Sequence, residues 1–221
     1  MARPILTDSE VEVVREKVCD AASSLFSKHG VENVGLRSIG SKVGFTGAAL
    51  YRYFPQGREE IVAAVRTRAF KELADLSEGA IGSSATPLER FRAVAEAYVA
   101  FAQNDTVSYR LLFSRMQSGN FAGLRKEARR AREILFRVAQ EAAQSEQTNG
   151  DGRVWAHVAW AAIHGAVMLE TSDMLKMGVD ITQLMDGVAR ALSRLNGTSK
   201  KTAVNYFPER PGREPSRTCR G

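Results

Sequence analysis

Residues 33–58 form a stretch in which every charged side chain is basic. The stretch contains no Asp or Glu, and its charged residues are Arg37, Lys42, Arg52 and Arg58, which gives a local charge of +4. The 32 residues before it carry four Lys or Arg and six Asp or Glu, a net charge of −2. Guanidinium and ammonium groups pair with phosphate oxygens. The cluster therefore predicts the binding of a polyanion on one positive face.

The other reactive residue types do not form an enzyme motif. No G-x-S-x-G elbow, phosphate-binding loop or metal motif occurs in the sequence. His157 and His164 lie about 10 Å apart along a predicted helix axis, and no Cys or acidic cluster joins them. Cys19 and Cys219 are not spaced as a metal-binding pair or a disulfide framework. We therefore expect a protein that is not an enzyme and that uses no cofactor or metal.

The composition is that of an ordinary globular protein, with 44% hydrophobic and 25% charged residues. The net charge is +6, but residues 197–221 alone contribute +4, from six Lys or Arg and two Asp or Glu. Overall basicity is thus mostly a property of that tail. The beginning of the sequence lacks the apolar run of a signal peptide, and the longest apolar stretch, Val154 to Leu169, is too short and too polar to span a bilayer. We expect a cytoplasmic protein with no membrane partner.

Two short helices joined by a turn are predicted around the basic residues. Leu36, Ile39 and Val43 have helical spacing, and Gly44 supplies the left-handed conformation that ends a helix. Thr46 then caps a second short helix. Two helices joined by a short turn with glycine form the helix-turn-helix pattern, whose second helix enters the major groove of DNA. On spacing alone, a helical hairpin that binds no DNA remains the alternative.

Residues 21–61 resemble the N-terminal domain of the TetR family of bacterial transcriptional regulators. That family usually has an Ala-rich first helix ending in L-F-x-x-x-G, an I-A pair, an A-G-V turn, and L-Y-x-x-F followed by basic and acidic residues. The corresponding residues here are Ala21, Ala22, Leu25, Phe26, Gly30, Ile39, Val43, Gly44, Phe45, Leu50, Tyr51, Phe54, Arg58, Glu59 and Glu60. The resemblance implies a DNA-binding homodimer.

Three positions depart from the family pattern. Gly40 replaces the usual Ala, Gly35 stands where a Ser or Thr usually caps the helix, and residues 55–57 lengthen the link to the basic residue. Glycine inside a helix costs about 1 kcal/mol relative to alanine. We expect a softer helix over residues 36–43 and the same fold.

The predicted DNA contacts combine the charge pattern with the resemblance. The resemblance assigns phosphate contacts to Tyr51, Tyr53 and Arg58, and charge adds Arg37 and Lys42. The residues expected to face base edges are Thr46, Gly47, Ala48, Ala49 and Arg52. Alanine methyl groups can contact thymine methyl groups, so specificity would rest on Arg37, Arg52 and the shape of the DNA.

The rest of the chain has helical periodicity, and no segment alternates with period two over a useful length. We predict an all-α fold of about nine helices. Residues 1–60 would form the helix-turn-helix domain, residues 61–196 a helical domain for effector binding and dimerisation, and residues 197–221 a disordered basic tail. A helix that starts at Arg58 would connect the two domains.

Two apolar helices near the end of the chain predict a homodimer. In the helix from Arg153 to Lys176, one face carries mostly small residues, namely Ala156, Ala159, Ile163 and Ala166. The last helix adds a stripe of Leu, Ile and Met, and the two helices with their symmetry mates would form a four-helix interface. The alternative is that these helices bury only against preceding helices of the same chain.

Aromatic and imidazole side chains predict an effector site. Trp160, His164 and Gly165 resemble the W-x-x-x-H-G signature of one class of TetR-family C-terminal domains, and the earlier Y-x-x-F and Y-R-L-L-F stretches resemble its other recurrent segment. The predicted lining of an apolar pocket with a few orienting polar groups is Tyr98, Phe101, Tyr109, Phe113, Trp160 and His164. The alternative is that Trp160 and His164 are core residues that tie helices together.

These observations lead to one main functional prediction. The chain is expected to be a repressor that binds a palindromic DNA operator and is released by a small apolar or aromatic effector. The alternative is a helical DNA-organising or partner-binding protein without effector control.

Overall fold

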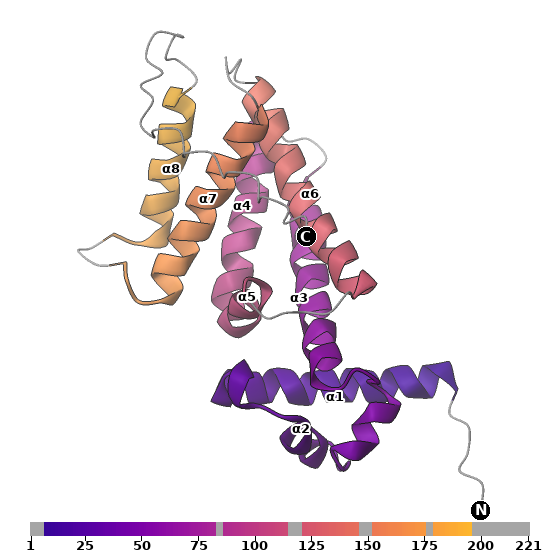
Figure 1. Cartoon of the computed structure of the whole chain (residues 1–221). Coiled ribbons are helices and arrows are strands. Elements are labelled where there is room, and N and C mark those ends of the chain that lie inside the picture. Colours follow the sequence, from indigo (N-terminus) through magenta and orange to yellow (C-terminus); the bar gives the residue numbers. More distant parts are fainter. Residues whose placement is uncertain (1–6, 83–85, 115–120, 146–151, 176–178, 196–221) are drawn as a thin grey trace, which may run out of the picture.

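The structure is a computed structural model that describes residues 7–82, 86–114, 121–145, 152–175 and 179–195 (Figure 1). Within these residues the secondary structure is helical throughout, which confirms the all-α class. The described residues form eight α-helices, where about nine were expected, and two short 3-10 helices. The predicted tail, residues 197–221, lies outside the described residues.

In chain order the elements are α1 (Asp8–His29), η1 (Val31–Asn33), α2 (Leu36–Lys42), η2 (Ala48–Arg52), α3 (Arg58–Ala80), α4 (Pro87–Asn104), α5 (Thr106–Leu112), α6 (Ala122–Ser145), α7 (Gly152–Thr171) and α8 (Ile181–Leu195).

Helix α1 begins at Asp8, three residues before the apolar periodicity of this helix begins at Val11. The Thr7 hydroxyl accepts a hydrogen bond from the Glu10 backbone N–H at 3.3 Å, and the Glu10 carboxylate accepts one from the Thr7 N–H at 2.8 Å. This capping box satisfies donors that a helix start leaves open. The first turn is therefore held by its cap, although its side chains are exposed and polar and so add nothing to the apolar periodicity.

The second helix of the predicted helix-turn-helix is the 3-10 helix η2 and not an α-helix. The Leu50 N–H bonds the Gly47 carbonyl at 3.3 Å, and the Tyr53 N–H bonds the Leu50 carbonyl at 3.0 Å. Pro55 limits the segment, because proline lacks a donor and disfavours the α-conformation in the residue before it. Only a short helical piece fits between Gly47 and Pro55, and such pieces commonly take the 3-10 form.

Helices α1 and α2, η2 and the start of α3 enclose one apolar core at the lower end of the molecule in Figure 1. Its most enclosed side chains are Val18, Ile39, Leu50, Phe54 and Ile61, each with no exposed surface. These residues come from all four elements and the turn that follows η2. The core therefore holds the predicted reading unit, α2 and η2, against α1 and α3.

Arg15 of α1 connects the same elements through polar contacts. Its guanidinium donates to the Glu60 carboxylate of α3 at 3.0 Å and to the Tyr53 backbone carbonyl. It also lies over the Phe54 ring, 4.2 Å from the ring centre. Three attachments at one side chain fix the end of η2 relative to α1 and α3.

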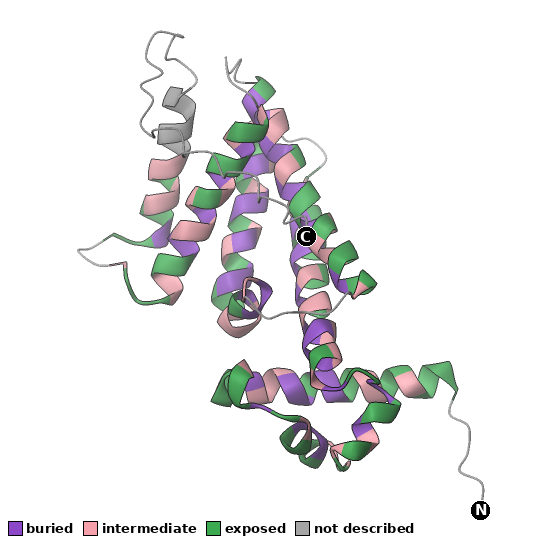
Figure 2. Cartoon of the chain, in the orientation of Figure 1, coloured by how far each residue is buried: buried purple, intermediate pink, exposed green. Residues whose placement is uncertain are grey.

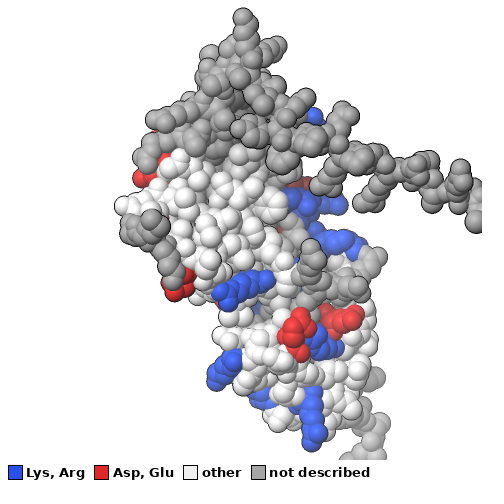
Figure 3. Space-filling model, turned by 60° about the vertical axis from the view of Figure 1, so that its left-hand side comes forward, with Lys and Arg blue, Asp and Glu red and all other residues white. Residues whose placement is uncertain are grey.

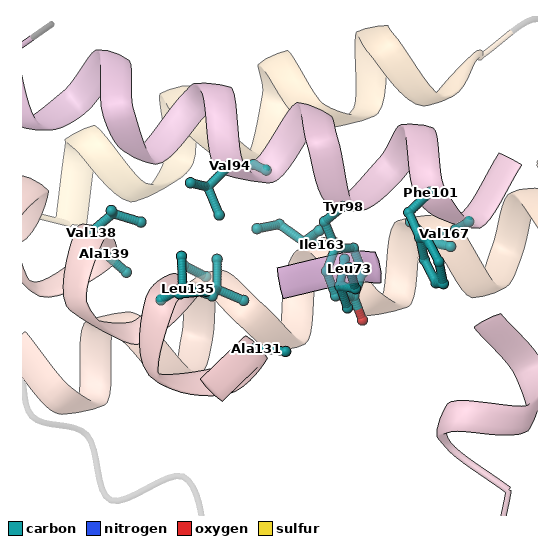
Figure 4. Packing of buried hydrophobic residues seen from close by; sticks show 14 of the residues in the cluster. Leu73, Val94, Tyr98, Phe101, Ala131, Leu135, Val138, Ala139, Ile163 and Val167 are labelled. Atoms are coloured by element: carbon teal, nitrogen blue, oxygen red, sulfur yellow. The ribbon is translucent and has the colours of Figure 1, made fainter. Parts of the chain in front are cut away.

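Helices α3 to α8 form the upper part of the molecule, in which α6 packs against α3, α4 and α7, and α8 packs on α7 (Figure 1). The core is built from side chains on the inner faces of these helices, including Leu73, Val94, Tyr98, Leu135 and Ile163 (Figure 4). Figure 2 shows the buried residues of these helices in purple where the helices face one another and exposed residues in green on their outer sides. No helix among the described residues is long and apolar enough to cross a membrane.

The small-residue face of α7 lies inside this core, which corrects its predicted use in dimerisation. Ala156, Ala159 and Ile163 have no exposed surface, and Ala166 is also buried. The face is therefore already covered by helices of the same chain. Small residues allow close approach by a helix of the same chain as well as by a helix of a partner chain. Their spacing alone therefore did not show which of the two covers this face of α7.

The contacts of Arg15 predict a stability effect. The variant Arg15→Met keeps the aliphatic stem and loses the hydrogen bonds to Glu60 and to the Tyr53 carbonyl. Because hydrogen bonds to charged groups contribute about 1.5 to 3 kcal/mol, we expect the free energy of unfolding to fall by about 2 kcal/mol in urea titrations followed by circular dichroism.

The matched control is Lys71→Met, which removes an exposed ion pair with Asp75 on α3. Exposed pairs of this kind contribute little, so this variant should unfold like the wild type. Equal effects of the two variants would contradict the assigned role of Arg15.

Candidate nucleic-acid interface

The reading unit consists of α2, a turn at Val43–Gly47, and η2. Gly44 has a φ of 78°, the left-handed value expected at this turn. The Thr46 hydroxyl accepts a hydrogen bond from the Ala49 N–H at 3.1 Å, so Thr46 stabilises the start of η2 from the residue before the N-cap, which is Gly47. The unit thus has the connection of a helix-turn-helix with a shorter second helix.

Most of the predicted DNA contacts lie on the surface of this unit. Arg37, Lys42, Thr46, Ala48, Tyr51 and Arg52 are exposed, and Gly47 and Ala49 are half-buried. The Lys42 ammonium group donates to the Ser24 hydroxyl of α1 at 2.6 Å. In Figure 3 the coloured side chains at the lower end of the molecule are blue Lys and Arg, and the red acidic side chains lie above that end, where further blue side chains also appear.

Tyr51 is held on the surface by its neighbours. Its side chain is 53% exposed, and its ring lies so close to Gly57 that a β-carbon there would be 3.0 Å from a ring carbon. The same added carbon would lie 3.4 Å from Leu36. The phenol is therefore positioned against the start of α3 without being covered.

Tyr53 does not share this exposure. It is 8% exposed, belongs to the core of the reading unit and packs against Phe45 with ring centres 5.7 Å apart. The resemblance carried a phosphate contact onto Tyr53, but its burial leaves only a small part of the side chain to reach DNA. The tyrosines alternate between surface and core because η2 turns their side chains to different sides.

Arg58 is bound within the protein. Its guanidinium donates from Nε to the Val34 carbonyl at 2.8 Å and from Nη2 to the Val31 carbonyl. These bonds hold η1 and the residue before Gly35 against the start of α3. A phosphate contact by Arg58 would compete with them, so the structure gives Arg58 a supporting role in this unit that charge counting could not show.

The predicted effector residues come together between α4, α5 and α7. The Tyr109 hydroxyl lies 2.6 Å from His164 Nδ1, and the Tyr98 hydroxyl lies 3.2 Å from the same nitrogen. Phe113 contacts the His164 ring at a centre distance of 4.5 Å, and Trp160 lies 6.1 Å from it. We call these five residues the aromatic cluster. Phe101, the sixth predicted residue, is buried in the same helical core.

Burial sets the protonation of the aromatic cluster. It lowers the pKa of His164, raises the pKa of Tyr98 to about 12 and raises the pKa of Tyr109 further. All three groups are therefore neutral near pH 7. We assign the shared proton to the Tyr109 hydroxyl, which donates to Nδ1, so that His164 carries its own proton on Nε2.

Helix α5 contacts both cores, a feature that the sequence did not predict. Leu111 belongs to the core of the reading unit, whereas Tyr109 and Leu112 belong to the core of the upper helices. The Arg66 guanidinium of α3 also donates to the Leu112 carbonyl at 3.0 Å. The buried residues between 109 and 112 alternate between the two cores, and this alternation was the available signal in the sequence. A seven-residue helix is too short for periodicity to show which of its faces meets which core.

An exposed basic face on a helix-turn-helix unit, carried by a second helical domain, defines a class of DNA-binding regulators. Residues 18–65 match the family model described as bacterial regulatory proteins, tetR family. Residues 91–192 match the model described as tetracyclin repressor-like, C-terminal domain. The chain belongs to the TetR family of DNA-binding transcriptional regulators. The resemblance to the W-x-x-x-H-G class stays a prediction, because neither matched description names that class.

Two curated relatives match part of the chain. An uncharacterized HTH-type transcriptional regulator, YxaF of Bacillus subtilis, is 33% identical over 75 residues, which are 34% of this chain and 39% of that protein. The HTH-type transcriptional activator FasR of Mycolicibacterium smegmatis is 29% identical over 99 residues, 45% of each chain. The aligned part is thus less than half of either relative.

Solved structures extend the similarity of fold to most of the chain. A protein of unknown function from a Rhodococcus species superposes with a TM-score of 0.71 at 24% identity, over 82% of this chain and 94% of that one. The TetR family transcriptional regulator PfmR from Thermus thermophilus gives a TM-score of 0.62 at 18% identity, over 80% of this chain and 97% of that one. The arrangement of both domains is therefore a known one.

The different exposure of Tyr51 and Tyr53 predicts two separable mutant effects. Tyr51→Ala should leave the free energy of unfolding within about 0.5 kcal/mol of wild type and weaken binding to the cognate duplex about tenfold. Tyr53→Ala should lower the free energy of unfolding by about 3 kcal/mol, because it empties part of a core. Urea unfolding and fluorescence anisotropy measure the two quantities. A large loss of stability in Tyr51→Ala, or none in Tyr53→Ala, would contradict the assignment of Tyr51 to the surface and of Tyr53 to the core.

The lowered pKa of His164 predicts a dependence of stability on pH. The unfolded chain binds a proton on this group near the ordinary histidine pKa of about 6.5, whereas the folded protein binds it only at lower pH. The contribution of His164 to the free energy of unfolding is therefore fully present above the unfolded-state pKa. It falls as the pH drops through the unfolded-state pKa toward the folded-state pKa.

The test is urea unfolding of wild type and His164→Gln between about pH 8 and pH 5. We expect the variant to show a smaller decline in the free energy of unfolding over this range. An equal decline in both proteins would contradict the assignment of a neutral His164.

Proposed function

We propose that this regulator is a homodimeric repressor that binds a palindromic operator and leaves it when a small apolar or aromatic molecule binds. The observation that carries the DNA-binding part is the exposed face of the reading unit. Arg37, Lys42 and Arg52 are exposed on it, and residues 33–58 contain no acid that would repel phosphates. Such a face binds the DNA backbone and presents η2 to the major groove.

The proposed base readout uses few polar side chains. Thr46, Gly47, Ala48 and Ala49 offer small groups, so the backbone of η2 can come close to the base edges. Alanine methyl groups suit thymine methyl groups, and an arginine can bond guanine at two atoms. Arg52 is therefore the candidate for a directional base contact, and Tyr51, Arg37 and Lys42 are the candidates for phosphate contacts.

An exposed apolar stripe on α7 supports the homodimer. Val154, Val158 and Leu169 are 60%, 43% and 44% exposed, and Ala161 and Gly165 continue the spacing between them. A β-carbon added at Gly165 would have no neighbour within 4 Å, so this side of α7 is open. Burial of such a stripe against a second copy would bring two reading units to one duplex.

The aromatic cluster is the proposed effector site. It combines apolar rings with the neutral polar groups of Tyr98, Tyr109 and His164, a mixture typical of sites for small molecules. The rings contact one another in the described structure. A ligand that inserts among them would have to displace Tyr109 or Phe113, and both lie on or next to α5.

Displacement of α5 would reach the reading unit through packed contacts. Leu111 would leave the core of that unit, and the Arg66 bond to the Leu112 carbonyl would break. A ligand that favours the displaced arrangement lowers operator affinity by its differential binding energy. About 2 to 3 kcal/mol gives a loss of roughly thirtyfold to more than a hundredfold.

The experiment is selection of binding sites from a random duplex pool at about 0.15 M salt, followed by anisotropy titration of the winner and of a scrambled duplex. We expect a palindrome that binds about a thousandfold more tightly than the scrambled duplex. Equal binding of both duplexes would favour a DNA-organising protein without a defined operator. A reporter gene under the selected operator then tests repression, which activation like that named for FasR would contradict.

A matched pair of variants tests the dimer in the same assay. Val158→Glu puts a charge on the exposed stripe of α7 and should give a monomer that binds the palindrome weakly. Leu76→Glu puts the same charge at a 44% exposed position of α3 and should remain dimeric. Light scattering measures the mass, and a dimeric Val158→Glu protein would contradict the proposed interface.

A further inference from the structure

Gly40 stands where alanine is usual in the family, and its surroundings explain the choice. It is buried in α2, and a β-carbon at this position would lie 2.8 Å from the Phe45 carbonyl oxygen, 3.0 Å from the Thr46 carbonyl carbon and 3.1 Å from the Gly47 nitrogen. All three atoms are backbone. No side chain rotation can relieve these contacts, so the chain from 45 to 47 would have to move.

Two hydrogen bonds to the Gly40 carbonyl hold the turn that follows α2. The Gly40 carbonyl accepts from the Val43 N–H at 3.0 Å and from the Phe45 N–H at 2.9 Å. The turn therefore folds back over the glycine and continues directly into η2. Movement of the turn away from Gly40 would strain these bonds and carry the start of η2 with it.

A second glycine, Gly47, lies at the same contact with α2, on the segment that leads into η2. A β-carbon at Gly47 would lie 3.2 Å from the Arg37 nitrogen and 3.3 Å from the carbonyl carbon of Leu36. The backbones of α2 and of the segment that begins η2 thus contact each other with no side chain between them. The separation of the two elements is set by this pair of glycines.

We infer that Gly40 is a positioning residue for DNA recognition, because its missing side chain sets how close η2 lies to α2 and hence how far η2 projects into the major groove. The inference rests on the proposed contacts of η2 with base edges. Phosphate contacts from α2 position the domain on the duplex. The distance from α2 to η2 then determines whether the small residues of η2 reach the bases.

The movement of the turn that an added β-carbon would require is larger than the positional tolerance of groups that bind DNA. A contact of 2.8 Å must open to the ordinary van der Waals range that begins at 3.4 Å. Binding groups must be held within about 0.5 Å of their productive positions. Helix propensity acts in the opposite direction, because it favours alanine over glycine and would stabilise α2. The sign of the change in operator affinity therefore separates the displacement of η2 from the stabilisation of α2.

The test is Gly40→Ala in the full chain, with the selected operator and the scrambled duplex as probes. We expect operator binding to weaken by at least about tenfold, roughly the cost of one mismatched base pair. Binding of the scrambled duplex, which depends on phosphate contacts, should change less than about twofold. Substitution of each operator base pair in turn should also show a flatter profile of affinity losses than in the wild type.

The matched control is Gly79→Ala, since a β-carbon at this exposed position of α3 would have no neighbour within 4 Å. It should bind both duplexes like the wild type. If Gly40→Ala does not fold, Gly47→Ala carries the test, because its contacts are milder and should give a smaller loss of operator preference.

Three results would overturn the inference. The first is a Gly40→Ala protein with the operator preference of the wild type. The second is equal weakening on both duplexes together with a lower unfolding temperature, which would make the role of Gly40 one of stability alone. The third is an unchanged preference in Gly47→Ala. A wild-type protein without any preferred duplex would overturn the proposed function itself, and this inference with it.

Discussion

Apolar packing along α3 is the constraint on which the rest of the structure depends. Its first turns place Ile61, Val62 and Val65 in the core of the reading unit, and its later turns place Leu73 and Ala74 in the core of the upper helices. One continuous helix therefore belongs to both cores, and its hydrogen-bonded backbone transmits tilt better than a loop would. Burial of these side chains holds the reading unit at a defined angle to the upper helices, so any regulation of DNA binding has to work through this helix or around it.

Helix α5 supplies a second connection of a different kind. Helix α3 runs through both cores, whereas the seven-residue α5 contacts the core of the reading unit through Leu111 and Val107, and its Leu112 carbonyl accepts a hydrogen bond from Arg66 of α3. Short helices with few contacts open at lower cost than long packed ones. A molecule that binds at the aromatic cluster would therefore shift α5 before it shifted α3. Under the proposed mechanism the long helix would keep the domains together while the short one changed their relation, a division of roles that fits a protein that must stay folded in both states.

The sequence predicted the class of fold and the reading unit well, because those rest on local signals. Gly44, Thr46 and the spacing of Leu36, Ile39 and Val43 describe a helix and the turn after it without knowledge of the rest of the chain. The sequence did not show relations between distant residues, and the predicted use of Ala156 and Ala159 in dimerisation was wrong for that reason. The burial of Tyr53, the bonds of Arg58 to carbonyls more than twenty residues away and the internal packing of Ala156 and Ala159 depend on which surface meets which. The phosphate contacts of Tyr53 and Arg58 stay predictions. Residue type and spacing are the same for a side chain that faces DNA and for one that faces a neighbouring helix.

Energies decide whether the aromatic cluster suits a switch. A neutral hydrogen bond contributes about 1 kcal/mol net, but a buried polar group left without its partner costs about 1 to 3 kcal/mol. Separation of Tyr109 from His164 would leave the Tyr109 hydroxyl without this acceptor, whereas Nδ1 would keep the Tyr98 hydroxyl within 3.2 Å. An effector that offers an acceptor to the Tyr109 hydroxyl avoids that cost, whereas a hydrocarbon of the same shape does not. The difference is similar in size to the coupling of about 1 to 3 kcal/mol found between allosteric sites. The polar centre of an otherwise aromatic cluster would therefore decide which apolar molecules can release the operator.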